Sequence, residues 1–240
     1  MNKIISIASG KGGVGKSTVT AFLARELKEN GKKVLCVDCD IALRSLDMLF
    51  LSDDKVLYDW SDLITGRCPA EKCIIKADVD FIAAPTKPGE KYDKKAFSNA
   101  IKSLLPLYDF ILLDCPAGIE QGFELAAGAC ESGIIVATPD PVSLRSANRC
   151  VIELMKAGVN DNHLIINMFN KKSVQASKAL NIDSCIDLAG APLTGLIPFD
   201  ESVTSFVQTH KLPGEFSPFT RAIMRIAKRL LGEKSELRFE

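Results

Sequence analysis

Short, almost continuously apolar segments alternate with helix-like patterns from one end of the chain to the other. An apolar segment without polar alternation is typical of a parallel strand that is covered on both faces. We therefore predict strands over residues 4–8, 33–38, 80–84, 110–114, 133–138, 164–167 and 193–197.

Between these segments, apolar residues recur at the spacing of one helical face. The clearest sets are Val19, Phe22, Leu23 and Leu27; Val151, Leu154 and Met155; and Ile223, Ile226, Ala227, Leu230 and Leu231. Alternation of strands and helices predicts a doubly wound, mostly parallel α/β sheet with helices on both faces. Because no linker, repeat or shift in composition appears, we predict one domain over 1–232 and a short charged tail over 233–240.

Composition narrows the class of protein. Thirty basic residues balance thirty acidic ones, which argues against a dedicated polyanion binder. No apolar run is long enough for a membrane-spanning helix, and the N-terminus is too short for a signal peptide. We therefore expect a cytoplasmic protein with reduced cysteines. Cys36 and Cys39 lie three positions apart in an apolar run that is typical of a strand, so they should face opposite sides and bury as small apolar residues.

A glycine-rich segment follows the first predicted strand and opens the first predicted helix. It reads SGKGGVGKST over residues 9–18 and fits the phosphate-loop pattern G-x-x-x-x-G-K-S/T. Backbone N–H groups of such a loop converge on phosphate oxygens at a helix N-terminus. Lys16 should reach the β- and γ-phosphates, Ser17 should bind Mg²⁺, and Thr18 should add a phosphate contact.

The same glycines also fit the dinucleotide fingerprint G-x-G-x-x-G through Gly10, Gly12 and Gly15, with Asp38 as its ribose-binding acid. The Lys16–Ser17 pair favours a nucleoside triphosphate with Mg²⁺, because a dinucleotide loop does not require it.

Acidic residues end two of the predicted strands. Asp114 closes the strand 110–114, where a P-loop NTPase holds its Walker B carboxylate near Mg²⁺. Asp38 and Asp40 follow the second strand; Asp38 is placed to hold a metal-bound water and Asp40 to polarise an attacking one. The alternatives are a helix-capping role for Asp114 and solvated loop positions for Asp38 and Asp40.

Four segments together resemble one family. The run 11–18 resembles the deviant Walker A motif of the MinD/ParA ATPases, with Lys11 as its second lysine. Residues 38–47 look like switch I of the MinD branch, 114–120 look like switch II, and 196–203 resemble the strand and loop that border the adenine. These motifs occur in the family's order over residues 1 to about 232.

The resemblance implies ATP and Mg²⁺ as ligands and slow ATP hydrolysis as a timer. Two ATP-bound subunits should pair face to face, each placing Lys11 on its partner's phosphates, with Asp40 orienting the water. The implied ligand sets are Ser17, Asp38 and Asp114 for the metal; and Gly10, Lys11, Gly12, Gly13, Val14, Gly15, Lys16, Ser17, Thr18, Asn167, Pro198 and Asp200 for ATP.

The resemblance also implies a role in division-site placement, with an inhibitor of division-ring assembly and an activator as partners. Three features depart from the MinD pattern. Ser45 stands in place of an asparagine, Ser146 stands in place of an aspartate, and no amphipathic membrane anchor follows Lys234. Membrane contact, direct or through a partner at the inner face of the membrane, therefore stays open. The basic amphipathic helix over 221–231 should be a core helix rather than a membrane-surface one.

Two other functions remain open within the superfamily. A ParA-like partition ATPase would bind non-specific DNA with steep salt dependence, although the balanced charge disfavours nucleic acid. A metal-cluster carrier or reductase would need a cysteine pair across the dimer interface, for which Cys115 in switch II is the candidate.

Overall fold

A parallel sheet forms the centre of the computed structural model, which describes residues 3–41, 43–50, 56–87, 89–176 and 180–237. In this part of the chain the sheet has seven strands in the order β3-β2-β4-β1-β5-β6-β7, and all neighbours pair in parallel. The bounds are β1 Lys3–Ser9, β2 Val34–Asp38, β3 Asp80–Ile82, β4 Phe110–Ala117, β5 Ser132–Ala137, β6 Asp161–Phe169 and β7 Leu193–Pro198. The predicted parallel α/β fold is confirmed.

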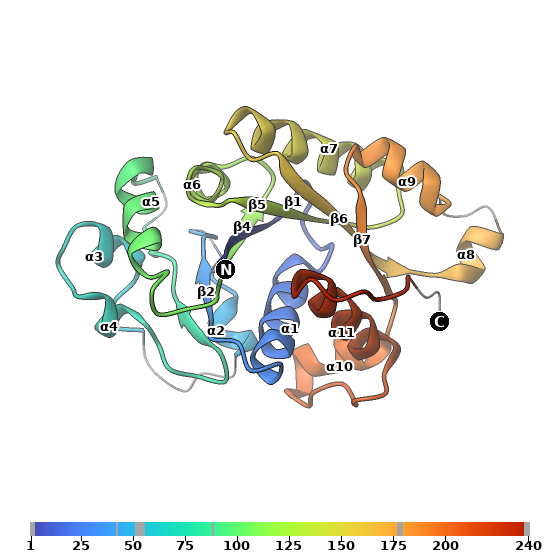
Figure 1. Cartoon of the computed structure of the whole chain (residues 1–240), viewed down its shortest axis with the longest axis horizontal. Coiled ribbons are helices and arrows are strands. Elements are labelled where there is room, and N and C mark those ends of the chain that lie inside the picture. The colour runs from blue at the N-terminus through green and yellow to red at the C-terminus, as the bar shows by residue number, and fades with distance from the viewer. Residues whose placement is uncertain (1–2, 42, 51–55, 88, 177–179, 238–240) are drawn as a thin grey trace.

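Helices cover both faces of the sheet (Figure 1). One face carries α1, α10 and α11, and the other carries α6, α7 and α9. Their bounds are α1 Lys16–Glu29, α2 Leu46–Leu49, α3 Trp60–Ile64, α4 Ala70–Cys73, α5 Lys94–Ser103, α6 Gln121–Ala129, α7 Pro141–Lys156, α8 Lys171–Gln175, α9 Ile182–Ala189, α10 Glu201–Thr209 and α11 Pro218–Leu230. Each face buries its own apolar cluster, as a doubly wound sheet requires.

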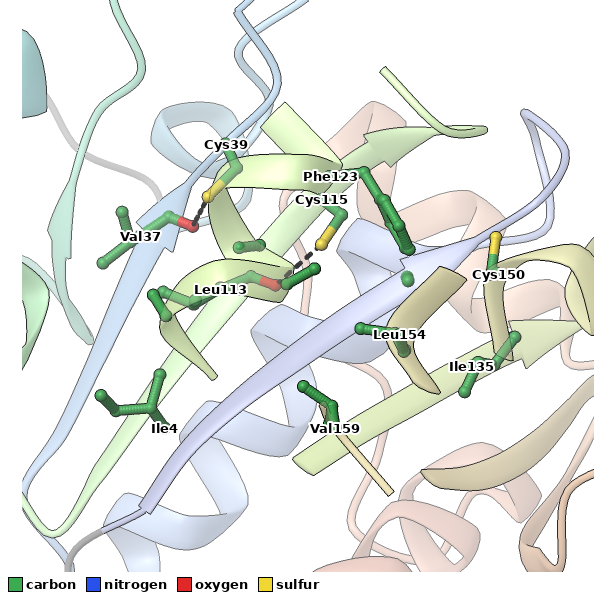
Figure 2. Packing of buried hydrophobic residues seen from close by; sticks show 14 of the residues in the cluster. Ile4, Val37, Cys39, Leu113, Cys115, Phe123, Ile135, Cys150, Leu154 and Val159 are labelled. Carbon is green, nitrogen blue, oxygen red and sulfur yellow. Dashed lines mark hydrogen bonds between the residues drawn. The ribbon is translucent and has the colours of Figure 1, made fainter. Parts of the chain in front are cut away.

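The cysteines pack as the strand geometry predicts. Cys36 belongs to the apolar cluster under α1 and α11, whereas Cys39 belongs to the cluster on the opposite face. Figure 2 shows Cys39, Cys115 and Cys150 among aliphatic side chains and Phe123. The Cys39 and Cys115 thiols donate to the carbonyls of Val37 and Leu113 at 3.8 and 3.7 Å. Seven of the eight cysteines are buried and all eight are free thiols.

The last helix is a core element, as its apolar stripe predicts. Ile223, Ile226 and Ala227 of α11 are buried against α1 and β7, and Arg229 donates to the carbonyls of Thr194 and Ser235. The boundary at residue 232 stays a prediction, and residues 238–240 of the predicted tail lie outside the described ranges. Within those ranges no helix has the length and apolar character needed to cross a membrane.

The strand order brings the predicted site together. Because β4 lies between β2 and β1, Asp38 pairs with Asp114, and Asp114 pairs in turn with Ile7 just before the glycine-rich loop. Both acids and the loop therefore meet at the carboxyl edge of the sheet, where ligands of open α/β sheets bind.

Candidate active site

The glycine-rich loop joins β1 to α1, and its shape depends on two glycines with positive φ. Gly13 has φ 78°, and Gly15, at the N-cap of α1, has φ 85°. A third glycine is required by close packing, since a Cβ on Gly10 would lie 2.3 Å from the Ser146 backbone of α7. Residues 11–13 are exposed, so their backbone N–H groups are open to a ligand. The loop is thus built to surround phosphate.

Lys16 lies under this loop and is paired inside the protein. Its ammonium Nζ is 2.9 Å from Asp114 Oδ1 and 3.0 Å from the Ser17 hydroxyl. Both partners of the ion pair are buried. Burial by itself lowers the pKa of Lys16, but the charge and hydrogen bond of Asp114 outweigh it and raise that pKa above its ordinary value. Lys16 is therefore a firmly charged group in contact with the predicted Walker B acid.

Asp114 ends the regular part of β4, and its two carboxylate oxygens differ in their contacts. Its Oδ1 accepts from Lys16 and, at 2.9 Å, from the Thr20 hydroxyl, whereas its buried Oδ2 has no hydrogen-bond partner among the described residues. A buried carboxylate oxygen without a partner is costly unless something cationic or a donor binds it. Together with the half-buried Ser17 hydroxyl, it supplies the hard oxygen donors that Mg²⁺ prefers. These residues fit a magnesium ion that also binds phosphate.

Asp38 holds the start of switch I in shape. Its Oδ1 accepts from the Asp40 N–H at 2.9 Å, and its Oδ2 accepts from the N–H groups of Ser45 and Leu46 at 2.9 and 3.2 Å. Burial, then the nearby charge of Asp114, raises the pKa of Asp38 to about 6, although the three N–H donors work in the opposite direction. The metal role predicted for Asp38 stays a prediction; the observed contacts of its carboxylate are with the switch backbone.

Asp40 and Lys11 are the two predicted catalytic groups that face outward. Asp40 is half-buried, and its Oδ1 accepts from the Leu43 N–H at 3.0 Å. Lys11 is exposed, and its charge acts on Asp140 at the N-terminus of α7. Burial alone would raise the pKa of Asp140, but hydrogen bonds from Thr138 and Ser143, together with Lys11, lower it. Lys11 therefore lies beside α7, free of the buried pair that holds Lys16.

The residues predicted to flank the base line one small cavity beside the loop. It is bounded by Gly15, Thr18, Asn167, Met168, Pro198, Phe199, Asp200, Val203, Thr204 and Phe219. The buried Asn167 amide donates to the Val14 carbonyl of the loop at 2.8 Å. The Asp200 carboxylate caps α10 through the Ser202 N–H at 2.9 Å and accepts from the Phe219 N–H at 3.2 Å. Thr18 borders this cavity together with Asn167 and Pro198, so its predicted contact with phosphate stays a prediction.

Sequence reasoning missed two residues and misplaced one. Thr20, on the second turn of α1, binds Asp114; the hint was its place one turn after Lys16 on the same helical face. Ser146, named above only as a departure from the MinD pattern, packs its backbone against Gly10. Cys115 does not face outward, which corrects the suggestion that it could meet a dimer mate: its side chain is fully buried in the core, and burial raises its pKa well above the usual range.

Comparison with known proteins agrees with this geometry. The family model ParA, described as an NUBPL iron-transfer P-loop NTPase, matches residues 1–231. The chain is 37% identical to the septum site-determining protein MinD of Helicobacter pylori over 253 positions, covering 97% of this chain and 92% of that protein. The MinD cell division protein of Aquifex aeolicus matches with a TM-score of 0.88 and 31% identity over 99% of this chain and 100% of that one, and its MinC:MinD complex matches with 0.87, 31% identity, and 99% and 98% coverage. MinD of Pyrococcus horikoshii, complexed with Mg-ADP, matches with 0.83 and 30% identity over 96% of both chains.

The fold and the loop define a P-loop ATPase that uses ATP and Mg²⁺. The chain belongs to the MinD/ParA family, and its likeness to MinD extends over almost its whole length. It is a MinD-like ATPase of cell-division site placement.

Proposed function

We propose that this ATPase acts as a nucleotide-dependent dimerisation switch whose slow hydrolysis times its release from a division inhibitor. The observation that supports this best is the contrast between two lysines of one loop. Lys16 is buried against Asp114, whereas Lys11 is exposed at the loop's outer surface. Charge that develops at the γ-phosphate would be met in part by a lysine from a second subunit, which arrives only on pairing.

Within one subunit, the roles follow from the contacts. Lys16 would exchange Asp114 for phosphate oxygens, while Ser17 and Asp114 Oδ2 would hold the magnesium. When bound, Mg²⁺ neutralises charge on the β- and γ-phosphates. The exposed N–H groups of residues 11–13 orient the phosphates. Asp40, held at the end of the switch by the Asp38 carboxylate, orients the attacking water.

A protein partner would be well placed on α7. Its outer surface exposes Val142, Ile152 and Met155, and its backbone at Ser146 contacts Gly10 of the loop. A partner on this helix would therefore lie next to the phosphate loop and sense its state. The MinC:MinD complex of Aquifex aeolicus supports a division inhibitor as that partner. Membrane contact would follow from such an assembly or from the chain itself.

The test combines oligomeric mass with ATP turnover. We would measure both for the wild type, Lys11→Ala and Asp40→Ala, each alone, with anionic liposomes and with DNA. The proposal expects a dimer with ATP that persists in Asp40→Ala, and loss of turnover in Lys11→Ala. A monomer under every condition would refute the switch, and stimulation by DNA in place of liposomes would indicate a partition ATPase.

A further inference from the structure

The backbone of switch I is anchored from outside the nucleotide site. The indole N–H of Trp60 donates to the Asp38 carbonyl at 2.9 Å, and the Trp60 side chain is fully buried. Trp60 is the first residue of α3, whose N-terminus is fixed by an Asp59 capping box. The backbone N–H of Trp60 donates to the Ala83 carbonyl at 3.2 Å. A buried carbonyl requires a donor, and here the donor comes from a helix that takes no part in the predicted site.

Asp38 is therefore held through both its side chain and its backbone. Its carboxylate gathers the N–H groups of Asp40, Ser45 and Leu46, and its carbonyl is bound by Trp60. The bonds to the carboxylate fix the backbone conformation of switch I. The bond to the carbonyl fixes the position of switch I relative to β2. The position of Asp40, two residues further on, depends on both.

The same indole contacts a segment that is bonded to switch II. Trp60 packs edge-to-face on Tyr92, with ring centroids 4.7 Å apart, and on Phe97 at 5.2 Å. In its hydrogen-bonded orientation, the Gln121 amide donates to the Glu90 carbonyl at 2.9 Å and accepts from the Tyr92 N–H at 2.8 Å. Gln121 is the first residue of α6, directly after switch II. Two hydrogen bonds thus join α6 to the segment that contains Tyr92, the residue on which Trp60 packs.

A cavity lies beside these contacts. A cavity of about 610 Å³ is lined by switch I, switch II and the segment around Tyr92, including Cys39, Ile41, Tyr92, Pro116 and Gly122. A rearrangement of one switch would then be transmitted through the aromatic contact and the Gln121 bonds to the other.

We propose that Trp60 is a positioning residue of the ATPase: its indole N–H fixes switch I at the Asp38 carbonyl, and its packing on Tyr92 couples switch I to switch II through Gln121. This inference rests on the proposed function, since it takes Asp40 as the residue that orients water. Coupling of this kind needs a direct energetic test.

The first test uses the wild-type chain, in which Trp60 is the only tryptophan. Its fluorescence emission is recorded without nucleotide, with Mg-ADP and with Mg²⁺ and a non-hydrolysable ATP analogue. We expect the analogue to change the emission maximum and intensity, and to do so more than ADP, because a γ-phosphate acts on both switches. Identical spectra in the three states would overturn the proposal without any substitution.

The second test is Trp60→Phe, which keeps a ring against Tyr92 and removes the N–H. We expect kcat for ATP to fall about fivefold to tenfold, the effect of one lost hydrogen bond, while KM stays within about twofold. Tyr58→Phe is the matched control, because it changes a partly exposed aromatic residue two positions away. A kcat for Trp60→Phe equal to that of the control would overturn the proposal.

Coupling to switch II is measured by adding Gln121→Leu. If the contacts form one path, the double variant loses less activity than the product of the two single effects; a multiplicative loss refutes the coupling. Asp40→Ala distinguishes a failure of the role proposed for Asp40 from a failure of the role proposed for Trp60. If that variant turns over ATP normally, the role of Asp40 fails, while the emission change and the Trp60→Phe kinetics still decide whether Trp60 anchors the switch.

Discussion

Replacing Lys16 by Met should destabilise the protein even when no nucleotide is present. The structure shows why: the Lys16 ammonium lies 2.9 Å from the Asp114 carboxylate, and the side chains are 8% and 0% exposed. Removing the cation leaves a buried carboxylate with the Thr20 hydroxyl as its remaining observed hydrogen-bond donor. Breaking a buried ion pair in this way costs about 3–5 kcal/mol. For a chain of this size, that lowers Tm by about 10 °C.

The assay is urea denaturation of the full chain in buffer containing EDTA and no nucleotide. Lys11→Met is the control, since Lys11 belongs to the same loop but is exposed, and surface changes stay within about 0.5 kcal/mol of the wild type. Adding Asp114→Asn to Lys16→Met should recover at least about half of the lost stability, because no unpaired charge is then buried. The reasoning is refuted if Lys16→Met and Lys11→Met unfold at the same urea concentration.

Three further substitutions test other contacts of the site. Gly10→Ala places a Cβ 2.3 Å from the Ser146 backbone, so it should abolish ATP binding in equilibrium dialysis, whereas Gly31→Ala at an open turn should not. Thr20→Val removes the hydroxyl that binds Asp114 at 2.9 Å. We expect it to lose about 1.5–3 kcal/mol of unfolding free energy, whereas Thr20→Ser should lose little because it keeps the hydroxyl. Equal stability of the wild type, Thr20→Val and Thr20→Ser would contradict this. Asp200→Ala should cost about 0.5–2 kcal/mol at neutral pH through the lost α10 cap. Hydrogen bonds outweigh burial and lower the pKa of Asp200, so its contribution is present above the unfolded pKa of about 3.9 and disappears as pH falls through the folded value; a wild-type advantage that persists at lower pH would refute this.

Local patterns were enough to predict the strands and the phosphate loop. Apolar runs report burial on both faces, and the G-x-x-x-x-G-K-S/T spacing belongs to eight consecutive residues, so neither depends on distant parts of the chain. The prediction that Cys36 and Cys39 face opposite sides succeeded for the same reason, since it follows from the period of a strand.

Contacts between distant segments could not be predicted in this way. Lys16 and Asp114 are 98 positions apart, and they meet because β4 lies beside β1 in a strand order that alternation alone does not define. The bond from Trp60 to Asp38 spans 22 positions and involves a tryptophan that no motif marks. Asp200 was assigned to the base by resemblance, although an acid two positions before Ser202 is also a common helix cap.

The contact between Lys16 and Asp114 also constrains how nucleotide binding must proceed. The Lys16 ammonium is paired with Asp114 Oδ1, whereas Asp114 Oδ2 is the oxygen that a metal would bind. Lys16 can leave Asp114 at low cost only if another cation replaces it, because an unpaired buried carboxylate is strongly destabilising. Ser17 and Asp114 Oδ2 would hold Mg²⁺, whose charge would compensate Asp114 when Lys16 turns to a phosphate. Mg²⁺ and ATP should therefore raise each other's affinity. Asp114→Asn should weaken that dependence, so that Mg²⁺ improves ATP affinity less in the variant than in the wild type.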